Sequence, residues 1–149
     1  MSRLADKILA FHEAAHGVTA IRYSLPLEFV TTRPDGGGHA QLCKSWFDRS
    51  IPSAALHAFL HAGRECEMRL HGDEKLADAH ASHDFHFSGL LRQVDQPETA
   101  RYSNLAAGRA LAKGIVETDW RWIARVANEL LAHRYVTAAR VRELRCECR

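Results

Sequence analysis

The sequence predicts a mainly helical domain with a small β element, an α+β fold. Apolar residues recur at helical spacing over most of the 149 residues. The exception is residues 27–33, rich in β-branched residues and followed by the turn PDGGG and a second strand-like stretch, residues 39–47. A chain of this length most simply forms one domain, residues 1–149, around one core.

The first helix is expected to begin at a Ser2 cap and to end near Tyr23, before Pro26. The residues expected to face the core at helical spacing are Leu4, Ile8, Phe11, Ala15 and Val18. The two strand-like stretches, joined through the glycines, then predict an antiparallel hairpin with one open edge.

The second helix is expected over about residues 51–71, opened by Ser50 and Pro52 and closed by Gly72. Residues 73–82 are interpreted as a polar connection. A third helix is expected from about Ser82 or Asp84 to Val94, and two more over about residues 97–115 and 117–133. Thr137 is expected to cap a last short helix, AARVREL.

Composition excludes several classes of function. The formal net charge is only +2, which gives no reason to expect a nucleic acid or an anionic membrane as partner. No apolar run approaches 18 residues, so no membrane span is expected. The pattern GxxxxGK[ST] is absent, so we expect no ATP bound through a P-loop. The four cysteines form no CxxC pair and the chain starts without a secretory signal, so a reducing cytoplasmic compartment is expected.

The stretch HEAAHG carries the most specific chemistry. His12 and His16 are four residues apart, which places them on one face of a helix where both imidazoles can bind one Zn²⁺ ion. Glu13 follows the first histidine, where a carboxylate can take a proton from metal-activated water. This is the HExxH arrangement of zinc peptidases. The simpler alternative is a buried helix with two unligated histidines, but it would bury Glu13 without a partner, which is costly.

A catalytic zinc site usually has three protein ligands, so a third is expected elsewhere. The metzincin pattern would need a histidine at position 22, which is an arginine. Spacing leaves the choice open among Glu65, Glu67, His80, His83, Asp84 and His86. The pair His57 and His61 also has i,i+4 spacing, but it lacks a neighbouring glutamate and is interpreted as core packing.

Four stretches, in the right order, resemble the peptidase domain of the FtsH family of AAA+ zinc metalloproteases. They are FHEAAHGVTAI, LPLEFVTTRPDGGGHAQ, AGRECEMRLHG and ASHDFHFSGLLRQV. The late stretch WRWIARVANELLAHRYVTAARVREL is similar to the closing helices of that domain. Ala15 and Gly17 depart from the family, which commonly has glycine and then alanine there.

The resemblance implies a zincin-like helical peptidase domain in which His12, His16 and Asp84 bind Zn²⁺ and Glu13 is the catalytic base. It also aligns Glu67 with a family glutamate, which we interpret as orienting a ligating histidine.

The expected function is zinc-dependent hydrolysis of unfolded or extended polypeptides. A substrate strand is expected to add to the open edge at Gly38, His39, Ala40 and Gln41. The alternative is a zinc-binding interaction or adaptor domain without autonomous proteolysis. Members of the family carry transmembrane helices and an ATPase module, and we expect neither within these 149 residues. We therefore expect either a homo-oligomer or a separate ATPase as partner.

Overall fold

The computed structural model describes residues 2–43, 50–94 and 100–147. The elements, in chain order, are α1 (Arg3–Arg22), β1 (Leu27–Thr32), β2 (Gly38–Leu42), α2 (Ser53–Leu70), α3 (Glu74–His80), α4 (Ser82–Val94), α5 (Arg101–Thr118), α6 (Trp120–His133), β3 (Tyr135–Thr137) and α7 (Ala138–Cys146). The chain is therefore mostly helical with one small antiparallel sheet, which confirms the predicted fold class.

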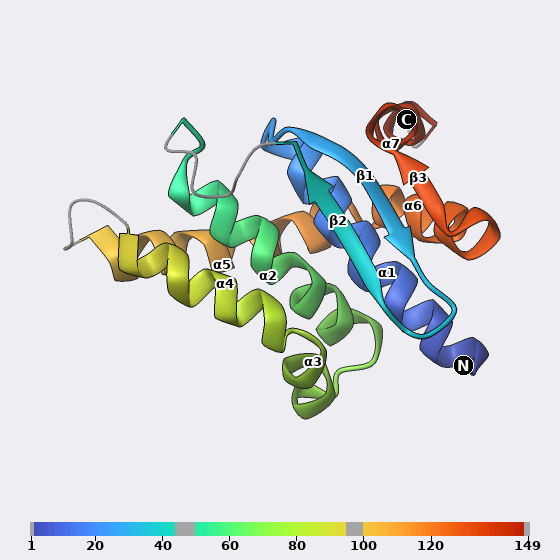
Figure 1. Ribbon diagram of the computed structural model, residues 1–149, viewed down its shortest axis with the longest axis horizontal. Helices are drawn as coiled ribbons and strands as arrows, with labels where there is room; N and C mark the ends of the chain where they lie inside the picture. Colours follow the sequence, from blue (N-terminus) through green and yellow to red (C-terminus); the bar gives the residue numbers. More distant parts are fainter. Residues whose placement is uncertain (1, 44–49, 95–99, 148–149) are drawn as a thin grey trace.

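Helix α1 is central, because α2, α6 and the sheet all pack against it (Figure 1). Ser2 caps its start as predicted, with Oγ accepting a hydrogen bond from the Ala5 N–H at 3.2 Å. Most of the predicted apolar stripe is buried, but Leu4 is 67% exposed. It lies in the first turn and lines the cleft described below. A Cβ at Gly17 would stand 2.6 Å from Val30, so this glycine lets the sheet approach the helix.

The sheet has the order β2-β1-β3, and both strand pairs are antiparallel. The predicted hairpin is β1–β2, in which Thr32 lies opposite Gly38. The second strand was expected to reach residue 47, but β2 ends at Leu42. Residues 44–47 lie outside the described residues. Strand β2 forms one edge of the sheet, next to the N-terminal helix.

Strand β3 is an element that the sequence did not predict. It pairs with β1 so that Val136 lies opposite Val30, and both side chains are buried. Three residues are too few to show the alternation by which strands are recognised. The strand leads directly into α7, whose predicted cap is confirmed, since Thr137 Oγ1 accepts from the Arg140 N–H at 3.1 Å.

The prediction that residues 73–82 form a polar connection is wrong, because Glu74–His80 form helix α3. Asp73 is its cap, accepting a hydrogen bond from the Leu76 N–H at 3.0 Å. The helix has only two turns and buries Ala77 alone. Such a short helix shows no apolar stripe, and this explains why it was interpreted as a loop.

The other helices lie close to their predicted ranges. Helix α5 begins at Arg101, while its expected start at Pro97 lies outside the described residues. It continues to Thr118, beyond the expected end near 115, and α6 then begins at Trp120. Within the part of the chain that the structure describes, no helix is long and apolar enough to cross a membrane.

A buried polar cluster joins α2 to α4. Ser88 Oγ lies 2.7 Å from His57 Nδ1 and 3.1 Å from His61 Nε2. Both histidines are buried, which confirms that this i,i+4 pair packs in the interior. Burial, helped by the positive charge of Arg109, lowers the pKa of His61 to about 4. The imidazole of His61 is therefore neutral in the folded protein near neutral pH.

This depressed pKa predicts acid sensitivity of the fold. The unfolded chain takes up the proton near pH 6.5 and the folded chain only near pH 4, so the contribution of His61 to the free energy of unfolding should fall by about 3 kcal/mol across that interval. Above pH 6.5 the contribution is fully present. We expect His61→Gln to remove this loss, because glutamine does not titrate and can still contact Ser88.

The measurement is urea unfolding of chelator-treated protein at a series of pH values between 7 and 4. His133→Gln serves as the control, since that imidazole is exposed at the end of α6. Parallel pH dependences for wild type and His61→Gln would contradict the assignment.

Candidate metal centre

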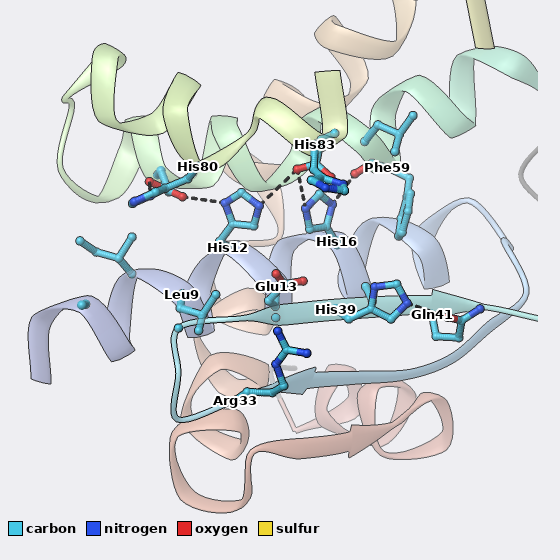
Figure 2. A pocket seen from close by; sticks show the side chains of 18 of the residues that line it. Leu9, His12, Glu13, His16, Arg33, His39, Gln41, Phe59, His80 and His83 are labelled. Carbon is cyan, nitrogen blue, oxygen red and sulfur yellow. Dashed lines mark hydrogen bonds and ion pairs between the residues drawn. The ribbon is translucent and has the colours of Figure 1, made fainter. Parts of the chain in front are cut away.

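Side chains from two helices meet at one point between α1 and α4. His12 and His16 lie one turn apart on α1 (Figure 2). The Nε2 atom of each lies 3.3 Å from Oδ2 of Asp84 in α4. One potential ligand atom from each residue lies within 4.8 Å of the other two. The structure thus brings the two motif histidines together with the aspartate that the family resemblance implied.

The second ring nitrogen of each histidine fixes which tautomer is present. His16 Nδ1 lies 2.6 Å from the backbone oxygen of Phe59, which can only accept, so Nδ1 carries the proton. His12 Nδ1 lies 2.6 Å from Oε1 of the Glu67 carboxylate, with the same consequence. In the neutral imidazoles, both Nε2 atoms then direct lone pairs towards Asp84.

Two nitrogen lone pairs and a carboxylate oxygen repel one another at this separation unless a cation lies between them or the nitrogens carry protons. Two imidazoles with a carboxylate are a usual donor set for Zn²⁺ when a fourth position is left for water or substrate. Ligating histidines also typically donate their other N–H to a carbonyl or carboxylate, as His12 and His16 do here. The three residues therefore fit a zinc ion.

The electrostatics of these side chains favour a cation in the same place. Although burial alone would raise it, the charges and hydrogen bonds of His16 and His12 hold the pKa of Asp84 well below its usual range. Burial opposes a charged imidazole at His12, but hydrogen bonds with Asp84 and Glu67 outweigh burial and raise the pKa of His12. The carboxylates of Asp84 and Glu67 thus impose a negative potential on this point.

One face of α2 supports the motif histidines. Phe59, Gly63 and Glu67 follow one another at spacings of four, so they lie in line along the helix. The backbone oxygen of Phe59 accepts a hydrogen bond from His16, and the carboxylate of Glu67 accepts one from His12. A Cβ at Gly63 would overlap the His12 ring, so only glycine allows α2 this close. Sequence reasoning found Glu67 but missed Phe59 and Gly63, because neither residue carries a functional group that marks a metal site.

Glu13 lies on the side of α1 that faces β2 (Figure 2). It is 7% exposed, and a Cβ at Gly38 would overlap its carboxylate, so β2 passes directly over it. Burial raises the pKa of Glu13, although His16 and His12 partly offset the effect. A carboxylate with a raised pKa beside a metal site is suited to accept and return a proton.

A cleft of about 1100 Å³ opens between β2 and the motif face of α1. The predicted edge segment Gly38, His39, Ala40 and Gln41 lines it, together with the metal-site residues. Strand β2 pairs with β1 along one edge, and among the described residues no strand pairs with its other edge. Apolar side chains cover much of the remaining wall: Leu4, Ile8, Leu9, Leu60, Leu76 and Phe87.

The other candidates for the third ligand lie in different places. Glu65 forms an ion pair with Arg64 at 3.0 Å. His86 is exposed, and His83 lines the cleft. His80 contacts Glu67 rather than the trio itself, as described further below.

Comparison with known proteins assigns this chain to no family. A scan against models of protein families finds no match for this chain, and a search of curated proteins finds none either. The geometry of the site therefore carries the functional argument.

Proposed function

We propose that this chain is a zinc-dependent endopeptidase, similar to the peptidase domain of the FtsH family, that hydrolyses extended polypeptides. The observation that carries the proposal is the position of Glu13. It lies between a His, His, Asp trio that fits zinc and an edge strand that lines a cleft. A purely structural metal site has no use for a carboxylate placed in this way.

His12, His16 and Asp84 would hold the ion. When bound there, zinc supplies a Lewis acid that makes water more acidic and polarises a carbonyl group. Glu13 takes the proton from the attacking water and then passes it to the amine nitrogen as the C–N bond breaks. One water is thereby added across the amide, giving a carboxylic acid and an amine.

The cleft supports an extended substrate. The free edge of β2 can hydrogen-bond a peptide as an additional strand, so that main-chain contacts supply affinity irrespective of sequence. Gly38 brings this strand directly over Glu13, so the bound backbone would pass beside the proton acceptor. A folded protein cannot present its backbone in this form, so unfolded chains are the expected substrates.

The test is hydrolysis of a fluorescently labelled, permanently unfolded polypeptide by zinc-loaded protein, with no nucleotide present. We expect cleavage that stops on chelation, returns when zinc is restored and does not extend to a stably folded protein that carries the same label. Zinc binding without cleavage under these conditions would contradict autonomous proteolysis. It would favour a zinc-binding interaction domain or an enzyme that needs a separate ATPase.

A further inference from the structure

We propose that His71 and His80 are positioning residues of the candidate metal centre and act on His12 through the buried carboxylate of Glu67. The inference rests on the metal-binding half of the proposed function and does not need the hydrolytic half. Neither residue belongs to the HExxH motif. They come from different places, the C-terminal cap of α2 and the last residue of α3.

Glu67 is fully buried and both of its carboxylate oxygens are engaged. Oε1 lies 2.6 Å from Nδ1 of His12. Oε2 lies 3.0 Å from Nε2 of His71 and 2.8 Å from Nδ1 of His80. A buried carboxylate is costly unless hydrogen bonds satisfy it, and here three imidazoles do so.

The direction of these hydrogen bonds can be worked out from the backbone. His71 Nδ1 accepts a hydrogen bond from the Asp73 N–H at 3.0 Å. A neutral His71 therefore carries its proton on Nε2 and donates it to Glu67. Glu67 then accepts a hydrogen bond from His71 through Oε2 and one from His12 Nδ1 through Oε1. When His12 is neutral, its Nε2 lone pair is then left facing Asp84, as a metal ligand requires.

The two contacts on Oε2 also fix how the Glu67 carboxylate is turned. With Oε2 held by His71 and His80, Oε1 stays directed at His12 and holds that ring in the ligating orientation. Carboxylates that orient a ligating histidine typically change metal affinity by about 10–100-fold. Losing the groups that hold the carboxylate should therefore weaken the ion's binding, although neither group touches it.

The experiment compares variants that remove the donor with variants that keep it. His71→Leu and His80→Leu remove it. His71→Gln and His80→Asn keep it, because the Gln Nε2 and Asn Nδ2 amides can donate from about the places of the imidazole Nε2 and Nδ1 atoms. His133→Leu, at an exposed site on α6, is the control. Zinc affinity is measured by competition with a chromogenic chelator, and site geometry by the visible spectrum of the Co²⁺-loaded protein.

We expect each leucine variant to bind zinc about tenfold more weakly and to shift the Co²⁺ bands. The amide variants and the control should remain close to wild type. Leucine variants that fold and bind zinc like wild type would overturn the inference, as would amide variants that lose as much as the leucine ones. The His80 side chain is 42% exposed, so His80→Leu is expected to fold. The comparison of the two His80 variants therefore decides the question even if His71→Leu does not fold. Wild-type protein that binds no zinc would instead overturn the proposed metal site itself.

Discussion

Glu13→Gln is expected to abolish most hydrolysis while leaving zinc binding intact. Glutamine has the same shape, so it keeps the close contact with Gly38, but it cannot take the proton from water. General-base groups typically contribute about 10²–10⁴-fold to the rate, and we expect kcat/KM to fall by about that factor. The proposed ligands His12, His16 and Asp84 are untouched, so we expect the variant to bind one zinc ion per chain, as is expected of the wild type.

Loss of activity in this variant should not reflect unfolding. Burial raises the pKa of Glu13, which means that its charge is disfavoured at this place, so an uncharged side chain should fold at least as well. Glu65→Gln is a matched control, because Glu65 pairs with Arg64 on α2. Steady-state kinetics and zinc titration on the three proteins decide the question. Undiminished turnover by Glu13→Gln would remove Glu13 from the role of general base.

The part of the site that lies within one helical turn was readable from the sequence. His12, Glu13 and His16 are local, and the i,i+4 rule fixes their mutual geometry once the segment is helical. The partners of His12 lie 55 and 72 residues away at Glu67 and Asp84. Spacing rules apply only within one helix or strand, so they could not select these two residues among the candidates. Their roles were predicted only from the resemblance to a family.

The pair His57 and His61 shows why spacing alone is insufficient. It repeats the i,i+4 pattern, yet both rings meet the hydroxyl of Ser88 in the interior. What separated the two pairs in the sequence was the residue after the first histidine, Glu13 in one case and Ala58 in the other. A glutamate in a buried stripe needs a chemical reason to be there, and an alanine does not.

Contacts made by the backbone were the least predictable. The carbonyl of Phe59 fixes the tautomer of His16, and the missing side chain of Gly63 admits the ring of His12. Neither residue carries a functional group that would mark it as part of a metal site. Their roles follow from the packing of α2 on α1, which depends on the whole fold rather than on local composition.

Asp84→Ala is expected to have the largest effect on metal binding. Removing a carboxylate that merely orients a ligand costs about 10–100-fold in affinity, so removing a direct ligand should cost at least about 100-fold. The two histidines keep their contacts with Glu67 and Phe59, so they would remain in place as a two-ligand site. Two imidazoles without a third protein ligand do not form the usual catalytic zinc site.

Asp78→Ala is the matched control, because Asp78 lies on the neighbouring helix α3 and pairs with Arg64 at 2.7 Å. Competition with a chelator of known affinity, followed by hydrolysis assays at saturating zinc, separates lost binding from lost chemistry. We expect Asp78→Ala to bind zinc like wild type and Asp84→Ala to be inactive at zinc concentrations that saturate wild type. Wild-type zinc affinity in Asp84→Ala would show that the ion is held elsewhere. The approach of Asp84 to both Nε2 atoms would then be an ion pair with protonated imidazoles rather than a metal centre.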